Sequence, residues 1–250
     1  MLVGLAVTVP AVSHATIVEF DTNFGTFQVN LYDVDTPETV ANFLAYVQDG
    51  NYSDSVIHRS IAGFIIQGGA LVTDSNAMLS EITTRAPVTN EPVFGNVRGT
   101  IAMAKLASDP NSATSQWFFN LSDNTANLDN QNGGFTVFGE VVGNGMIVVD
   151  AMAAVQTYNG VGGLNDFPLQ NYTAPNNIVT ANFLIINSVT VIDTTVNSAA
   201  GLNPTPTTRG TSTGGGTNLN GGGGGGAFGA AALLVLLSVS WRRHRRLQAA

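Results

Sequence analysis

The stretch HRSIAGFIIQGG, residues 58–69, places a cation inside a nearly unbroken run of apolar residues and glycines. That cation is Arg59, whose guanidinium has five rigid donors and keeps its charge. Because an apolar setting makes an unpaired charge costly, we expect Arg59 to be hydrogen-bonded, with Gln67 as the candidate partner. The glycine pair after Gln67 permits a tight turn, which predicts a strand end where Arg59, Phe64 and Gln67 face a ligand.

Two further motifs follow in the same order along the chain. The first combines MA at residues 103–104 with SQWFFN at residues 115–120, whose alternation is typical of a half-buried strand and places Gln116 and Phe118 on one face. The second is FTVFGEV at residues 135–141. Together the three motifs resemble those of the cyclophilin family of peptidyl-prolyl cis-trans isomerases, and the resemblance covers roughly residues 16–193.

Many short predicted strands with frequent turn residues indicate a mainly β protein, either a barrel or a sandwich. The residue pattern leaves these two alternatives open. The resemblance implies a closed eight-stranded antiparallel barrel capped by two α-helices.

Local patterns predict the first strands and both helices. Residues 16–31 alternate as two strands joined by a turn at residues 21–25. A first helix begins at Thr36-Pro37-Glu38, with the threonine as its cap, and ends at Gly50. A second helix is predicted from residue 146 to about residue 155. The buried faces of the two helices are expected to carry Val40, Phe43, Leu44 and Val47, and Val149, Met152 and Ala153.

The resemblance also implies a catalytic site. Arg59 is expected to donate to the prolyl nitrogen, and Gln67 and Gln116 to hold the flanking peptide and the arginine. The remaining residues are expected to form an apolar slot for the proline ring and to line the cleft: Phe64, Ile65, Phe118 and Leu128 in the slot, Ala104 and Phe135 along the cleft. Taken one at a time, Phe64 and Phe118 have the alternative of being plain core aromatics.

Two positions depart from the family pattern. Lys105 stands where members often have an asparagine that binds substrate backbone, and Asn127 stands where eukaryotic members carry a tryptophan. These changes affect the rim of the cleft and leave the residues around Arg59 in place. We expect His58 to be a fully hydrogen-bonded structural histidine without a catalytic role.

Composition excludes several function classes. The region 16–193 contains all seventeen acidic residues but only four of the nine basic ones, so it repels phosphate backbones, and we expect no nucleic-acid binding. The absence of cysteine excludes disulfides and thiolate metal sites. Rotation about an Xaa-Pro bond requires no nucleophile, metal or nucleotide, and we expect no cofactor. The expected partners are proline-containing polypeptides, and we expect a monomer.

The two ends of the chain have different compositions from the region between them. Residues 1–15 have the apolar run and small residues of a secretory signal, without its cationic n-region, and a buried first strand is the alternative. Residues 194–226 form a predicted flexible Gly/Ser/Thr/Pro linker, residues 227–241 a short hydrophobic transmembrane helix, and residues 242–250 a basic cytoplasmic tail. The order of glycine run, short apolar helix and arginine cluster resembles bacterial GlyGly sorting signals, which an intramembrane protease reads. A permanent membrane anchor is the alternative.

These features predict an exported isomerase in a Gram-negative bacterium, periplasmic or on the cell surface, and at least transiently anchored to a membrane. Its expected function is to assist the folding of exported proteins by accelerating Xaa-Pro bond rotation. The alternative is a non-catalytic cyclophilin-shaped module that binds surface peptides or serves adhesion. The combination of Arg59, Gln67 and Phe118 favours the enzyme, because a module that binds only planar proline peptides needs no donor at the nitrogen.

Overall fold

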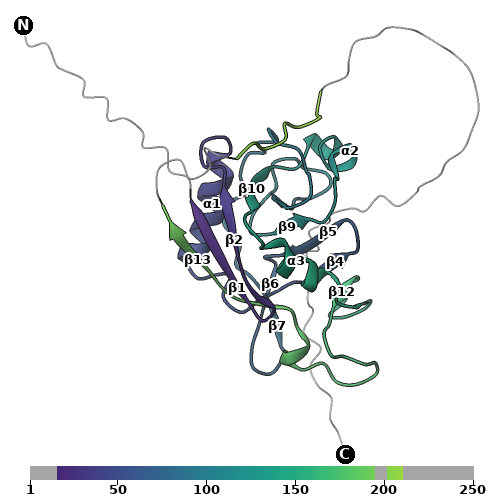
Figure 1. Ribbon diagram of the computed structural model, residues 1–250. Helices are drawn as coiled ribbons and strands as arrows, with labels where there is room; N and C mark the ends of the chain where they lie inside the picture. The colour runs from purple at the N-terminus through teal and green to yellow at the C-terminus, as the bar shows by residue number, and fades with distance from the viewer. Residues whose placement is uncertain (1–15, 195–201, 211–250) are drawn as a thin grey trace, which may run out of the picture.

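The computed structural model describes residues 16–194 and 202–210 (Figure 1). The predicted signal peptide, hydrophobic helix and basic tail lie outside these residues. Within the described ranges, no helix combines the length and the apolar character needed to cross a membrane.

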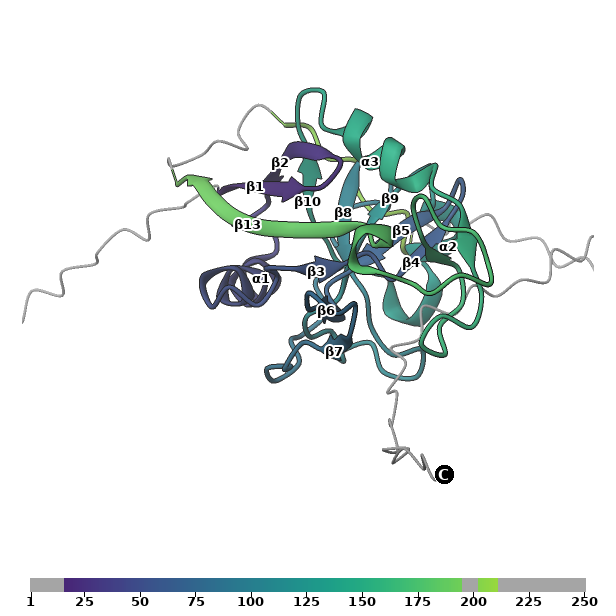
Figure 2. The same cartoon turned by 90° about the horizontal axis from the view of Figure 1, so that it is seen from below.

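One antiparallel sheet of eleven strands forms most of the described molecule, in the order β4-β5-β9-β8-β10-β2-β1-β13-β3-β6-β7 (Figure 2). Its strands are β1 Ile17–Thr22, β2 Gly25–Leu31, β3 Ser55–Val56, β4 Arg59–Ile61, β5 Ile65–Gly68, β6 Leu71–Thr73, β7 Leu79–Glu81, β8 Thr100–Met103, β9 Trp117–Asn120, β10 Val137–Val141 and β13 Ile185–Asp193. A separate hairpin pairs β11 Thr157–Tyr158 with β12 Phe167–Pro168.

The fold is mainly β as expected. The closed eight-stranded barrel is not confirmed, because β4 and β7 are open edges of the sheet within the described chain. Curling replaces closure. Val56 of β3 still pairs with Ile185 of β13, whereas Arg59 already pairs with Gln67 of β5. Ile57 and His58 therefore connect β3, inside the sheet, to β4 at its edge. These two strands are joined by the chain and not by strand pairing.

The helices are α1 Pro37–Gln48, α2 Thr125–Leu128 and α3 Met146–Ala153, with 3₁₀ turns at Gln131–Gly133 and Thr180–Asn182. The two predicted helices are present as α1 and α3. Thr36 occupies the N-cap position of α1 as predicted, with Pro37 after it, but its side chain does not make the capping hydrogen bond, because Oγ1 donates to the Tyr32 carbonyl. The Glu91 carboxylate accepts from the Thr39 amide at 2.9 Å, so a residue distant in sequence satisfies the helix N-terminus.

The two faces of the curled sheet bury different apolar clusters. The inner core contains stacked and edge-to-face aromatic rings from β1, β2, β9 and α1: Phe20, Phe27, Phe43, Trp117 and Phe119. Val40 of α1 and Val149 and Met152 of α3 also belong to this core, whereas Leu44 and Ala153 are only partly buried against it. A second cluster, the outer cluster, comprises Tyr32, Ile65, Ala102, Ala104, Phe118, Leu128, Phe135 and Val137.

A segment of the predicted flexible linker also belongs to the described structure. Residues 202–210, here called the strap, pair with the loop before β8: the Gly95 amide donates to the Thr205 carbonyl at 2.7 Å, and the Thr207 amide donates to the Val93 carbonyl at 3.1 Å. Figure 1 shows the strap in yellow-green, running past β10 toward α2. Composition, which predicts a flexible linker here, gives no sign of these contacts.

Candidate active site

Three predicted site residues lie in one row across the sheet. Arg59 of β4 is directly opposite Gln67 of β5, and Gln67 is directly opposite Phe118 of β9. Directly opposed residues of antiparallel strands share a face, so these side chains emerge on the same side. Along β9 the side chains alternate, which sends Trp117 and Phe119 to the inner core and Phe118 to the outer cluster.

The partner of Arg59 differs from the predicted one. Its Nε lies 3.9 Å from Oδ2 of Asp166, and the arginine side chain is 19% exposed. Burial lowers the pKa of Arg59, and the Asp166 carboxylate opposes that shift. Gln67 Nε2 instead donates to Gln116 Oε1 at 2.9 Å, while Gln67 Oε1 is buried with no hydrogen-bond partner among the described residues.

Asp166 is a residue that sequence reasoning missed. It lies in the hairpin between β11 and β12, where its amide donates to Asn159 Oδ1 at 3.0 Å and its carbonyl accepts from the Ser60 amide at 2.8 Å. The first bond closes the hairpin, and the second attaches it to the edge strand that carries Arg59. No local motif marks Asp166, because its role depends on a contact between segments about a hundred residues apart.

The predicted slot and cleft residues are brought together on the outer face. Ile65, Ala104, Phe118, Leu128 and Phe135 belong to the outer cluster, and Phe64 packs against it while remaining partly exposed. The Phe118 and Phe135 rings meet edge to face, with centroids 5.9 Å apart. An apolar surface thus adjoins the row of Arg59 and Gln67, and Phe118 belongs to both.

Lys105 is buried beside this surface, with 1% exposure. Its ammonium donates to the carbonyls of Asn132 and Gly134 and lies 4.8 Å from the centroid of the Phe135 ring. Burial, with a smaller contribution from the positive charge of Arg209, lowers the pKa of Lys105 to about 8. The lysine therefore anchors the loop that carries Phe135, a role that its place in the MA motif does not indicate.

His58 is buried next to the row of Arg59 and Gln67, and its environment favours the neutral form. Burial, followed by the nearby charge of Arg59, lowers the pKa of His58 to about 4. Its Nδ1 has no hydrogen-bond partner within the described chain. The expectation of a fully hydrogen-bonded histidine is therefore wrong.

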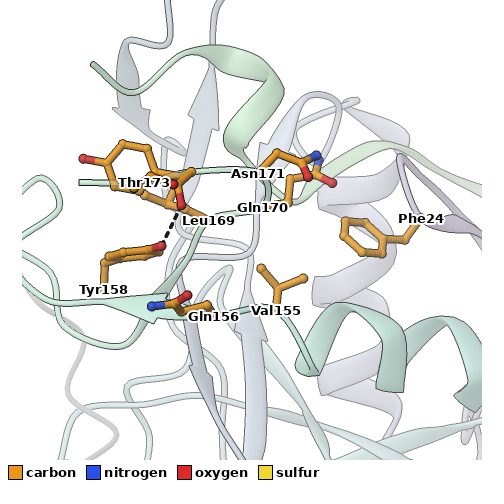
Figure 3. Close-up of a pocket in the computed structure, with 9 residues that line it drawn as sticks. Phe24, Val155, Gln156, Tyr158, Leu169, Gln170, Asn171 and Thr173 are labelled. Carbon is orange, nitrogen blue, oxygen red and sulfur yellow. Dashed lines mark hydrogen bonds between the residues drawn. The ribbon is translucent and has the colours of Figure 1, made fainter. Parts of the chain in front are cut away.

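A groove of about 1150 Å³ is lined by Arg59, Gln67 and Gln116. Apolar residues of the segments around β7 and β12, such as Leu79 and Leu164, also line it. A second hollow of about 660 Å³ surrounds Tyr158 and Gln170 and contains none of the predicted site residues (Figure 3). In the described residues, no group of three His, Cys, Asp or Glu side chains is placed to hold a metal ion.

Comparison with known proteins agrees with this geometry. The sequence model of the family described as "Cyclophilin type peptidyl-prolyl cis-trans isomerase/CLD" matches residues 17–176. A peptidyl-prolyl cis-trans isomerase of Acinetobacter baylyi is 41% identical over 160 residues, which are 63% of this chain and 81% of that relative. Peptidyl-prolyl cis-trans isomerase B of Escherichia coli is 41% identical over 147 residues, covering 56% of this chain and 86% of the relative.

A solved structure shows the same fold. The cyclophilin-type isomerase of Cryptosporidium parvum superposes with a TM-score of 0.53 at 21% identity, covering 72% of this chain and 99% of the other. With the family match over residues 17–176, the chain belongs to the cyclophilin-type peptidyl-prolyl cis-trans isomerases and is an isomerase of that type.

Proposed function

We propose that Arg59 accelerates Xaa-Pro rotation by donating to the prolyl nitrogen, while the outer cluster receives the proline ring. Resonance in the peptide bond creates a barrier of about 18–20 kcal/mol, and twisting the bond places a lone pair on the nitrogen. A donor aimed at that nitrogen stabilises the twisted amide more than either planar isomer, which is the condition for lowering the barrier. No covalent step is needed.

The observation that carries this proposal is the junction at Phe118. The polar row of Arg59 and Gln67 and the apolar cluster with Leu128 and Phe135 meet at this one side chain. An Xaa-Pro unit needs that combination, because its ring is apolar and its neighbouring carbonyls are polar. Gln67 and Gln116, already bonded to each other, offer amide groups to the flanking peptide.

Titration with an Ala-Pro peptide tests these roles. We expect the NMR signals of the Phe118 and Phe135 rings and of the Leu128 methyl groups to shift on binding, and exchange between cis and trans peptide to accelerate. In Arg59→Ala the ring shifts should persist while the acceleration largely disappears. Peptide-induced shifts confined to the hollow around Tyr158 and Gln170 would contradict the assignment.

We also propose that the enzyme acts on exported proteins. The proposal is supported by the secretory pattern of residues 1–15 and by the short apolar segment 227–241 followed by arginines, since positive charge next to a membrane segment stays on the cytoplasmic side. The domain would then work outside the cytoplasm on proline-containing polypeptides, and a sorting protease would remove the tail after about residue 226.

Cell fractionation and intact mass measurement of the exported protein test this second proposal. We expect a mature chain that lacks residues 1–15 and has lost the segment beyond the glycine run. A mature chain that still carries residues 241–250 would instead indicate a permanent anchor. An unprocessed chain in the cytoplasm would overturn export altogether.

A further inference from the structure

We propose that the strap is a working part of the proline slot, in which Thr208 acts as a positioning residue that holds Leu128 and Phe135 through Asp129. The inference rests on the proposed role of the outer cluster as the ring slot. It extends the working domain beyond residue 193, the boundary that composition indicates.

The first step is the environment of Asp129, which is 1% exposed. Oδ1 accepts from the Asn96 amide at 2.9 Å and from Asn96 Nδ2 at 3.0 Å. Oδ2 accepts from the Thr208 amide at 2.8 Å and from Thr208 Oγ1 at 3.1 Å. Because a buried carboxylate is tolerated only when it is hydrogen-bonded, the strap provides half of the interactions that keep Asp129 in place.

The second step links Asp129 to the slot. It directly follows Leu128, the last residue of α2 and a member of the outer cluster. Its partner Asn96 also donates from Nδ2 to the Phe135 carbonyl at 3.2 Å, and the Phe135 amide donates to the Leu128 carbonyl at 3.1 Å. A displacement of Asp129 therefore reaches both slot residues through one covalent connection and one hydrogen bond.

The third step is the attachment of the strap itself. Pro206 forms a bridge with Phe94, and Leu202 packs against the outer cluster together with Phe94. Pro204 and Pro206 restrict the backbone before it docks, which lowers the entropy lost on ordering the segment. The strap is thus held by backbone pairing and apolar contact on the N-terminal side of its bonds to Asp129.

The test uses the full chain with Thr208→Val, Thr208→Ser and Asn203→Ala, the last being an exposed strap residue outside the bonds to Asp129. We expect Thr208→Val to lower kcat/KM for an Ala-Pro peptide about three- to tenfold and to speed hydrogen exchange of the Phe135 amide, because a bond to a buried charge is lost. Thr208→Ser should restore both quantities, and Asn203→Ala should change neither.

A second variant replaces residues 205–208 with a Gly/Ser segment of equal length, and urea denaturation reports whether the inner core is intact. If this folded chain keeps the native kcat/KM and the native exchange at Phe135, the proposal is overturned. If it does not fold, the Thr208→Val and Thr208→Ser pair decides, and equal activity of these two variants overturns the proposal. Failure of the proposed ring slot is distinguishable, since the native chain would then show no peptide-induced shifts at Phe118.

Discussion

The inner core and the outer cluster share strands β5, β8, β9 and β10 but are held in different ways. Trp117 and Phe119 point inward to rings of β1 and β2, with centroid distances between 5.3 and 5.7 Å. Phe118, between them in sequence, points to the outer face. There the covering loop of residues 124–134 is held by asparagine amides, Asp129 and Lys105.

The two kinds of packing have different consequences. Close packing of aromatic rings stabilises the fold regardless of what binds outside, whereas a loop held by directional bonds can present apolar side chains at a surface without collapsing over them. Substitutions in the inner core should therefore lower the free energy of unfolding, and substitutions in the row of Arg59, Gln67 and Phe118 should lower activity.

Phe119→Ala should have the largest effect. Phe119 is fully buried against Phe20, Phe27 and Trp117, so its truncation should lower the free energy of unfolding by about 3–5 kcal/mol, measured by urea denaturation. The matched variant is Phe64→Ala at the partly exposed rim of the slot, which should cost far less stability. Equal losses in the two variants would break the proposed distinction between the faces.

Acidification should have the second largest effect, a loss of folding stability through protonation of His58. The folded pKa of His58 is about 4 against an ordinary value of 6.5, so the unfolded chain binds the proton first. Stability is then intact above pH 6.5 and is lost as the pH falls from 6.5 toward 4, by about 3 kcal/mol at about 1.4 kcal/mol per pH unit. His58→Gln should lack this slope in urea denaturation across that range, and parallel curves for the two proteins would argue against a buried neutral histidine.

Arg59→Ala should lower kcat/KM by about two orders of magnitude, or about 2.7 kcal/mol, in a protease-coupled isomerase assay, because a charge-assisted donor to the twisted amide is lost. Stability should change little, since the guanidinium lies at the surface of the cleft. Arg98→Ala is the control: Arg98 also pairs with a carboxylate, that of Asp150, but lies outside the row. Retained activity in Arg59→Ala would remove the proposed mechanism.

Asp166→Asn should have the smallest effect, a two- to threefold decrease in kcat/KM. The substitution keeps the backbone bonds to Asn159 and Ser60, and asparagine tolerates the left-handed backbone at this position, where φ is 56°. Only the carboxylate opposite Arg59 is lost. Because Asp166 is 43% exposed, added salt should reduce the difference between variant and native enzyme. A salt-independent difference would indicate a change of shape.

Local sequence predicted the first two strands and the two longer helices. Alternation along residues 115–120 predicted a shared face for Gln116 and Phe118, and Gln116 bonds to Gln67, which is paired with Phe118. The helical spacing of Val40, Phe43 and Val47 identified a buried side of α1. Such periodicity follows from backbone geometry, which is the same wherever the segment lies. The three ordered motifs also indicated the family, which the family match over residues 17–176 confirms.

Long-range contacts were decided only by the tertiary structure. The Arg59 side chain forms an ion pair with Asp166 instead of a hydrogen bond with Gln67, and Glu91 caps the N-terminus of α1. Part of the segment whose composition is typical of a linker binds Asp129. In each case the partner is dozens to a hundred residues away, so the energy of the contact exists only after the chain has folded.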